Sequence, residues 1–362
     1  MRKNNKRTIL IIEDNPLNVD IYVGFLAGEY NVKVATRGDK GVALAERFRP
    51  DLILLDIVLP DVDGYEVCRK LKTSNETKEI PVISISALSD VKDQAEGLSS
   101  GASDYIIKPS NPELMMARIR IHMELKSRRE SLDEQVKIRT KELESTKSAL
   151  IASMAILAEY RDVETGDHIG RTMHYVGAIC RNLREDYPEY MTEENIQLIS
   201  ESAQLHDIGK VAIPDKILLK EGPLTNCEFK VMKTHPITGA KVIMRAEKIL
   251  GKNSFLTFAR EIVEFHHEKW DGSGYPYGLK EDQIPLCAQI TSIADVYDAL
   301  VSERPYKTGY SHEKAMACIL EGDERTKPEH FSPKIIKAFI KSHQEFKEIS
   351  EHKIDLNRLE KN

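Results

Sequence analysis

Short apolar runs alternate with longer amphipathic segments from the start of the chain to residue 122. The runs are rich in Ile, Val and Leu, and they lie at residues 8–14, 31–36, 51–60, 81–87 and 104–109. Strands that are buried on both faces read as continuous apolar runs, and the segments between these five can hold helices. The pattern therefore predicts a doubly wound α/β domain over residues 1–122, with five parallel strands and helices on both faces of the sheet.

A different pattern begins at residue 111. Between Pro112 and Arg161 there is no glycine or proline, and Glu, Lys, Arg and Leu dominate, which predicts one long helix whose linker part covers residues 111–150. Apolar residues recur every seven positions, which is the spacing of a coiled coil, at Val136, Leu143, Leu150 and Leu157. Polar Arg139 and Thr146 occupy core positions between them. Two interpretations stay open: an imperfect coiled coil with a second copy, or a solvated helix that packs on its own domain.

The pattern from residue 150 to residue 345 is that of helices alone. Apolar residues come at spacings of three and four, without sustained alternation, and the loops are marked by stretches such as EGPLT and DGSGYP. We therefore predict an all-α domain over residues 150–345. Residues 346–362 are predicted to form a C-terminal tail.

Charge and cysteine usage exclude several classes of protein. The chain has 362 residues, 30% of them charged, and a net charge of −6, so it lacks the basic character of nucleic-acid-binding proteins. No apolar run approaches the roughly 18 residues of a membrane span, and the run TILII near the N-terminus is too short for a signal peptide. The five cysteines are scattered without a C-x-x-C pair, so we expect reduced thiols in a cytoplasmic protein.

Polar side chains stand where the predicted strands of the first domain end. Glu13 and Asp14 end the first strand, Asp56 the third, Ser86 the fourth and Lys108 the fifth. Ligands bind beyond the carboxyl ends of parallel strands, and clustered carboxylates suit Mg²⁺. A Mg²⁺-bound Asp can accept a phosphoryl group, whose extra oxygens a lysine and a hydroxyl would stabilise.

These residues, with LLDIVLPDVDGYE around Asp56 and DYIIKP at 104–109, resemble the receiver domain of two-component response regulators over residues 6–122. The resemblance implies a flavodoxin-like fold, Asp56 as the phosphorylated residue and a sensor histidine kinase as partner. It also implies a cis peptide bond between Lys108 and Pro109. The Mg²⁺-binding and switch residues that it implies are Glu13, Asp14, Asp56, Ser86, Tyr105 and Lys108.

Histidines and carboxylates cluster in five short motifs of the second domain. The motifs are RDVETGDHIGR, HDIGK, KTHPITG, EFHHEKWDGSGYP and TSIADVYDAL. Mixed imidazole and carboxylate ligands suit Fe²⁺, Mn²⁺, Zn²⁺ or Co²⁺. Eight candidate ligands are too many for one ion, so we expect two or three metals, an arrangement that suits phosphoester hydrolysis. The eight are Glu164, His168, His206, Asp207, His235, His266, His267 and Asp295.

Two longer stretches, HHEKWDGSGYP and ADVYDALVSERPYK, make residues 150–345 similar to the HD-GYP domains of the HD superfamily. Members hydrolyse cyclic di-GMP to linear pGpG and often on to GMP. The resemblance implies all eight ligands, with Asp207 bridging two ions and Glu164 and His168 added in members that hold a third metal. Fe and Mn are the metals expected. It implies a catalytic lysine, Lys210, that faces the attacked phosphate, and three substrate-binding residues, Tyr275, Arg304 and Lys307.

Two departures from the family pattern concern loops. Ser332 stands where Asp is common, and Glu221 stands where Pro is frequent. Two alternative functions stay open. The domain could be a non-catalytic sensor of cyclic di-GMP, or it could hydrolyse a different cyclic dinucleotide such as the hybrid of GMP and AMP.

The adjacent pair His266–His267 raises a question of geometry. Neighbouring side chains on a helix point about 100° apart, which is awkward for one ion. We expect the two imidazoles to bind different ions of one cluster, with Asp207 between them. The turn from Gly272 to Pro276 is expected to bring Tyr275 back over that cluster.

Two further expectations concern regulation and assembly. Phosphorylation of Asp56 is expected to change the receiver face around Tyr105. The helix at residues 111–160 would carry this change to Glu164 and His168. The same helix suggests a homodimer.

Overall fold

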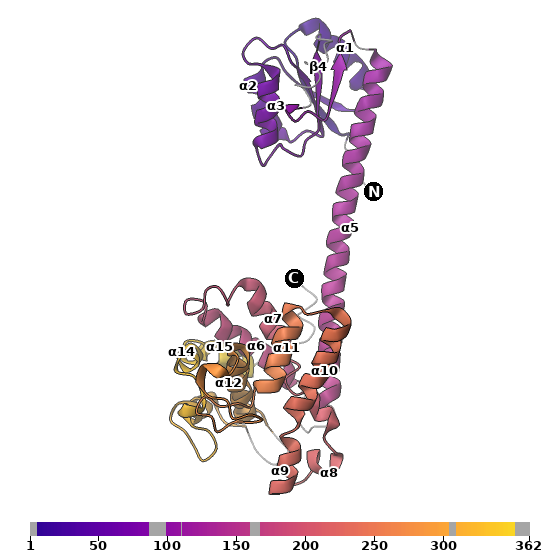
Figure 1. The fold of residues 1–362 in the computed structure, drawn as a ribbon. Helices are drawn as coiled ribbons and strands as arrows, with labels where there is room; N and C mark the ends of the chain where they lie inside the picture. Colours follow the sequence, from indigo (N-terminus) through magenta and orange to yellow (C-terminus); the bar gives the residue numbers. More distant parts are fainter. Residues whose placement is uncertain (1–5, 87–98, 110, 160–166, 304–308, 352–362) are drawn as a thin grey trace. The chain divides into compact units, whose positions relative to one another are not determined.

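The computed structural model describes residues 6–86, 99–109, 111–159, 167–303 and 309–351. The chain divides into two compact units, residues 1–141 and residues 142–362. The first contains a sheet with flanking helices, whereas the described part of the second is helical (Figure 1).

A five-stranded parallel sheet forms the centre of the first unit. Its order is β2-β1-β3-β4-β5, and all the strand pairs are parallel. The order reverses beside β1, so the carboxyl ends of β1 and β3 flank the position where such sheets bind ligands. The five predicted strands are confirmed as β1 (Thr8–Ile12), β2 (Asn31–Ala35), β3 (Leu52–Asp56), β4 (Val82–Ser86) and β5 (Asp104–Ile107).

Helices cover both faces of this sheet, as predicted. Successive residues of a strand point to opposite faces, and β1 serves two cores in this way. On one face Ile9 packs with Tyr22 of α1 and Met115 of α5. On the other, Leu10 packs with Leu71 of α3. The described helices of this unit are α1 (Pro16–Leu26), α2 (Gly38–Phe48), α3 (Gly64–Thr73) and the first part of α5 (Pro112–Glu159).

The predicted long helix is confirmed as α5, a single helix of 48 residues. Near its C-terminal end, Ile151 and Ala155 are buried in a core of the second unit. The heptad positions are exposed instead, and the exposed fraction of Leu143 is 70%. Pairing of α5 with a second copy stays a prediction. Among the described helices, none has the length and apolar character needed to cross a bilayer.

The described part of the second unit is built from helices, as expected. The α-helices after α5 are α6 (Asp167–Asn182), α7 (Glu193–Ala203), α8 (Asp215–Leu218), α9 (Asn226–Met232), α10 (His235–Leu250), α11 (Ser254–Phe265), α12 (Leu286–Val301), α13 (His312–Leu320), α14 (Pro333–Lys341) and α15 (His343–Glu351). Short 3₁₀ helices are η1 (Ile208–Ala212), η2 (Glu281–Gln283) and η3 (Pro328–His330).

An aromatic cluster forms the main core of the second unit. Tyr175 of α6 stacks on Phe346 of α15 with ring centroids 4.4 Å apart, and Tyr297 of α12 meets Phe346 edge-on. Phe346 is fully buried. The expected tail from residue 346 is therefore wrong at its start, because α15 completes this core. Hydrophobic residues at three and four spacing continue into α15, and that signal could have placed the boundary later.

Candidate functional site

The carboxyl ends of β1, β3 and β5 bring together four of the residues predicted in the receiver. The carboxylates of Glu13, Asp14 and Asp56 lie close enough to hold one cation. The ammonium of Lys108 lies 2.8 Å from Glu13 Oε2 and 2.7 Å from Asp56 Oδ2. The predicted cis bond between Lys108 and Pro109 is present. Ser86 is the last residue of β4, and Tyr105 lies within β5.

The electrostatics of this group suit a phosphoryl acceptor. Burial raises the pKa of Asp56, Lys108 opposes that shift, and the charge of Glu13 adds to it. Burial alone would lower the pKa of Lys108, but its two carboxylate partners raise it. Lys108 therefore stays charged and partly offsets the repulsion between the two buried acids. A divalent cation would offset the rest.

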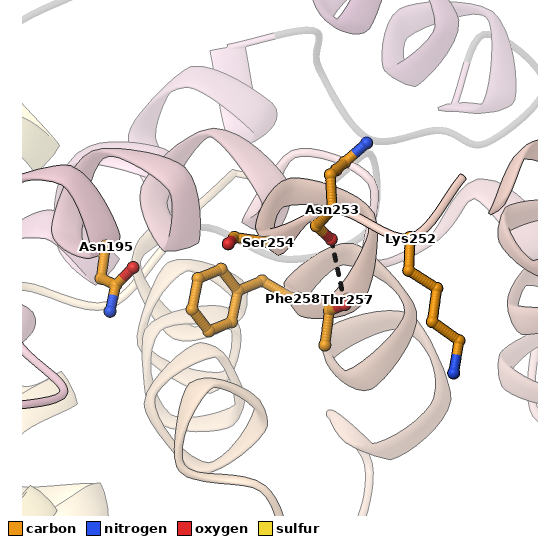
Figure 2. A pocket seen from close by; sticks show the side chains of 6 residues that line it. All are labelled: Asn195, Lys252, Asn253, Ser254, Thr257 and Phe258. Atoms are coloured by element: carbon orange, nitrogen blue, oxygen red, sulfur yellow. Dashed lines mark hydrogen bonds between the residues drawn. The ribbon is translucent and has the colours of Figure 1, made fainter. Parts of the chain in front are cut away.

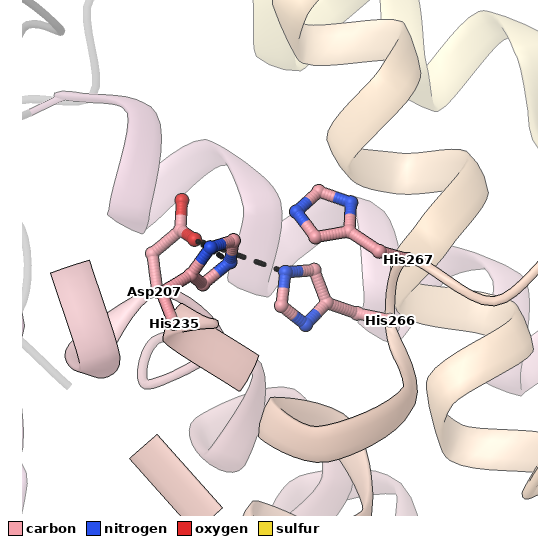
Figure 3. A group of neighbouring side chains, drawn as sticks. All are labelled: Asp207, His235, His266 and His267. Atoms are coloured by element: carbon pink, nitrogen blue, oxygen red, sulfur yellow. Dashed lines mark ion pairs between the residues drawn. The ribbon is translucent and has the colours of Figure 1, made fainter. Parts of the chain in front are cut away.

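In the second unit, the first group of candidate ligands consists of Asp207, His235, His266 and His267. Their ligand atoms lie within 4.8 Å of one another. His235 Nε2 is 3.1 Å from Asp207 Oδ1, and His266 Nε2 is 3.8 Å from the same oxygen (Figure 3). These residues are supplied by the start of η1, the first residue of α10 and the end of α11.

A second group adjoins the first. It consists of His168 of α6, Asp295 of α12, and His206, which lies just before η1. His206 Nε2 lies 3.7 Å from Asp295 Oδ1 and 3.3 Å from Asp207 Oδ2. Asp207 thus directs Oδ1 to the first group and Oδ2 toward the second. This is the arrangement required of a carboxylate that bridges two ions.

Backbone carbonyls fix the orientation of three of these imidazoles. The Nδ1–H groups of His206, His235 and His266 donate to the carbonyls of Ala203, Met232 and Ile262, at 2.9, 2.8 and 3.0 Å. Because a carbonyl oxygen can only accept, the proton is on Nδ1 and the Nε2 lone pair faces Asp207. Hydrogen bonds of this kind are the usual support of metal-binding histidines.

The residues present fit a metal centre. Among the described residues, the buried atoms Asp207 Oδ1, His235 Nε2 and His266 Nε2 make no hydrogen bond, and buried polar atoms rarely stay unsatisfied. Burial alone would raise the pKa of Asp207, but Lys210 and His206 hold it well below its usual range. Burial, with His266 and His235 nearby, holds the pKa of His267 well below its usual range. An ionised carboxylate and neutral imidazoles are the forms that bind metals.

The structure favours one shared ion for the histidine pair. His266 and His267 were expected to serve different ions, yet both have a ligand atom in the group of Asp207 and His235. Helix α11 ends at Phe265, and the chain turns at His266 and His267. The 100° spacing of a helix therefore no longer applies, and the ring centroids lie 4.0 Å apart at an angle of 41°.

The loop after this pair carries Tyr275 over the first group, as expected. The Tyr275 ring stacks on His267 with centroids 4.6 Å apart. Gly272 has a φ of 81°, and a Cβ at Gly274 would lie 2.3 Å from the backbone nitrogen of Lys269. The buried carboxylate of Glu268, which the sequence analysis missed, accepts backbone N–H bonds from residues 277, 278 and 279. This loop is held rigidly beside the candidate metals.

Comparisons with known proteins agree with this geometry. A family described as HD domain matches residues 141–329, and one described as response regulator receiver domain matches residues 9–120. A "probable cyclic di-GMP phosphodiesterase" of Vibrio cholerae is 41% identical over 95% of this chain and 79% of its own length. The chain belongs to the HD-GYP family of response regulators.

Two other relatives of this HD-GYP protein are informative. A cyclic di-GMP phosphodiesterase of Thermotoga maritima is 35% identical over 94% of this chain and 92% of its own length. A 3′3′-cGAMP-specific phosphodiesterase of Vibrio cholerae is 38% identical over 57% of this chain and 36% of its own length. The two names differ in the cyclic dinucleotide that they specify.

Three predicted site residues lie outside the described residues of the HD-GYP protein: Glu164, Arg304 and Lys307. Lys210 is described, and its Nζ lies 2.8 Å from Asp207 Oδ2. The structure thus brings together seven of the eight expected metal ligands with the expected lysine and tyrosine.

A buried carboxylate that the sequence analysis missed supports the second group. Asp298 Oδ2 is 2.6 Å from His168 Nδ1, and Arg171 donates to both oxygens of Asp298 at 2.7 and 2.8 Å. Burial would lower the pKa of His168, but Asp298 raises it to about 9. Asp298 therefore holds the His168 ring with Nε2 toward His206 and Asp295. The signal in the sequence is its place one helical turn after Asp295 in ADVYD.

A cavity of about 420 Å³ lies at the start of α11 (Figure 2). It is lined by Asn195, Lys252, Asn253, Ser254, Thr257 and Phe258. None of these belongs to either ligand group, and Asn253 uses its side chain to cap α11. We assign the cavity no catalytic role.

Replacing Asp298 is expected to weaken one metal site of the HD-GYP protein and spare the other. Asp298→Asn keeps the shape of the side chain but removes the charge that holds His168. Loss of such a supporting carboxylate costs about 10- to 100-fold in metal affinity. We expect metal analysis after dialysis to show a loss of about one equivalent per chain.

Asp282→Asn, at an exposed acid of η2, is the matched control and is expected to keep its full metal content. Unchanged metal content and affinity in a folded Asp298→Asn protein would show that Asp298 does not position His168.

Proposed function

We propose that this protein hydrolyses cyclic di-GMP with two or three divalent metals, and that phosphorylation of Asp56 controls the reaction. One observation carries the proposal: Asp207 belongs to the first ligand group through Oδ1, and its Oδ2 faces His206 of the adjoining second group. The names of two relatives that match nearly the whole chain supply the substrate.

The chemistry of the donor set favours phosphodiester hydrolysis. Bound divalent metals activate water and stabilise the charge that develops on a phosphate during attack. Mixed imidazole and carboxylate ligands suit several divalent transition metals, of which Fe and Mn are the ones proposed. Glu164, beyond the described residues, is the eighth ligand and would complete a third site beside His168.

Lys210 and Tyr275 have distinct roles toward the substrate. The ammonium of Lys210 lies beside Asp207, where it would stabilise negative charge on the attacked phosphate. Tyr275 covers the first group through its stacking on His267 and keeps bulk water from that side. From their places in the sequence, Arg304 and Lys307 would bind the second phosphate, Arg304 through two parallel hydrogen bonds. The product proposed is linear pGpG, with GMP after a second cycle.

The direct test is turnover of cyclic di-GMP by anaerobically purified protein, with product analysis. Activity is expected to disappear on chelation and to return with Mn²⁺ or Fe²⁺. Lys210→Ala is expected to lower kcat about 100- to 1,000-fold, as removal of one charge-stabilising donor does, while the metal content stays unchanged.

Lys216→Ala, at an exposed lysine of α8, is the control and is expected to keep full activity. Tight binding without hydrolysis in any metal would favour a sensor. Faster turnover of 3′3′-cGAMP, assayed in parallel, would favour the second substrate that the 3′3′-cGAMP-specific relative suggests.

Phosphorylation of Asp56 by a sensor histidine kinase is the proposed control. Asp56, Lys108 and Glu13 form the geometry of a receiver, and Ser86 and Tyr105 are the proposed switch pair. A phosphoryl donor is expected to change kcat/KM of the wild-type protein and to have no effect on Asp56→Ala. An equal response of both proteins, or of neither, would contradict this control.

A homodimer that pairs through α5 is the proposed assembly. Val136, Leu143 and Leu150 are more than half exposed, although they are large and apolar, and a parallel second copy would bury them in register. Leu143→Glu is expected to convert a dimer to a monomer in light scattering. Ile138→Glu is the control, because Ile138 is 49% exposed but points away from this face. A wild-type monomer at all concentrations would exclude the dimer.

A further inference from the structure

Two residues outside the metal groups lie against Tyr275: Phe229 of α9 and Lys233, which caps the end of that helix. The Phe229 and Tyr275 rings have centroids 6.3 Å apart and are nearly perpendicular, at 75°. Lys233 Nζ lies 4.7 Å from the Phe229 centroid and 5.0 Å from that of Tyr275. One ammonium thus stands over two aromatic rings.

This cluster continues directly from the metal site. Tyr275 stacks on His267, and His267 belongs to the first ligand group. The order from the metal outward is therefore His267, Tyr275, and then Lys233 with Phe229. A substrate whose phosphate lies at the metals has its ribose and base next to that phosphate, so the base can reach this cluster.

Phe229 is held in an exposed position by the local structure. Its side chain is 44% exposed. Helix α9 starts with a capping box between Thr225 and Glu228, and Lys220 lies against the same glutamate. A short helix with a fixed start presents a large aromatic face beside the site. Exposed single aromatics are ordinary on protein surfaces, but this one adjoins Lys233 and Tyr275, and Tyr275 stacks on the candidate ligand His267.

The surroundings carry positive charge. Lys233, Lys269 and Lys327 lie near one another, with the carboxylate of Asp271 beside Lys269. Lys269 Nζ is also 3.3 Å from His330 Nε2. An anionic ligand with a flat aromatic part could pair with Lys233 and cover the exposed ring.

We infer that Phe229 and Lys233 form the guanine subsite of this enzyme: the base stacks on Phe229, and Lys233 donates to guanine O6 and N7. The inference rests on the proposed hydrolysis of cyclic di-GMP and names the part of the site that reads its base. Aromatic rings stack with any base, whereas lysine favours guanine, which offers two acceptors where adenine offers an acceptor and a donor. Phe229 therefore gives affinity, and Lys233 gives the preference for guanine.

The test measures dissociation constants by calorimetry in metal-loaded protein that carries Lys210→Ala, which slows turnover. Cyclic di-GMP and cyclic di-AMP are the two probes. Adding Phe229→Ala is expected to weaken both about tenfold or more, as loss of a stacking ring does. Adding Lys233→Ala is expected to weaken cyclic di-GMP about tenfold and to change cyclic di-AMP much less.

Matched controls separate this subsite from general effects. Phe48→Ala removes a 42% exposed ring that also faces a lysine, but in the receiver. Lys334→Ala removes a lysine that lies over Tyr187. Val231→Ala tests the stability of α9. All three are expected to bind both dinucleotides as the parent does.

The outcomes distinguish the two claims. Unchanged dissociation constants in both test variants, or an equal loss for both dinucleotides in Lys233→Ala, would overturn the guanine subsite even if the enzyme is active. If neither dinucleotide bound measurably to the Lys210→Ala parent protein, the guanine subsite would be overturned as well. Tight binding with the expected variant effects, but no hydrolysis by the wild-type protein, would support the subsite and refute the proposed hydrolase.

Discussion

The convergence of buried imidazoles on one aspartate is the constraint on which the second unit depends. His206, His235 and His266 each use the Nδ1–H to satisfy a backbone carbonyl, which leaves the Nε2 lone pairs directed at Asp207. Buried polar atoms without a partner cost free energy. The arrangement therefore lowers the stability of the metal-free fold. Binding of a cation satisfies these atoms, so the same arrangement strengthens metal binding.

The candidate metal ligands are positioned by helix ends, where the chain changes direction. Asp207 precedes η1, His235 is the first residue of α10, and His266 caps α11. A helix interior would separate such neighbours around its axis, whereas a helix end lets the chain turn and bring two side chains to one place. The loop after His267 is fixed by a single side chain. The Glu268 carboxylate accepts three backbone N–H hydrogen bonds and so holds Tyr275 over the site.

Much of this could be predicted from the sequence. Apolar runs predicted all five strands, and the absence of Gly and Pro predicted α5. Motif resemblance identified the ligands that the structure groups together. The allocation of His266 and His267 could not be predicted from helical spacing, because it depends on the residue at which α11 ends. Asp298 was missed because its contact with His168 comes from the packing of α12 on α6, which are far apart in the sequence. The proposed role of Phe229 was missed because it depends on contact with Tyr275 in a later loop. The core contribution of Phe346 was missed because α15 is short, with nine residues, and most of them are polar.

Anomalous diffraction at the metal edge, from crystals of protein loaded anaerobically with Fe²⁺ or Mn²⁺, tests the central claim most directly. The account predicts one peak within the group of Asp207, His235, His266 and His267 and a second beside His168, His206 and Asp295. Asp207 should lie between the two peaks, which are expected about 3.5–4 Å apart as in other two-metal sites. A single peak, or two peaks that do not share Asp207, would contradict it.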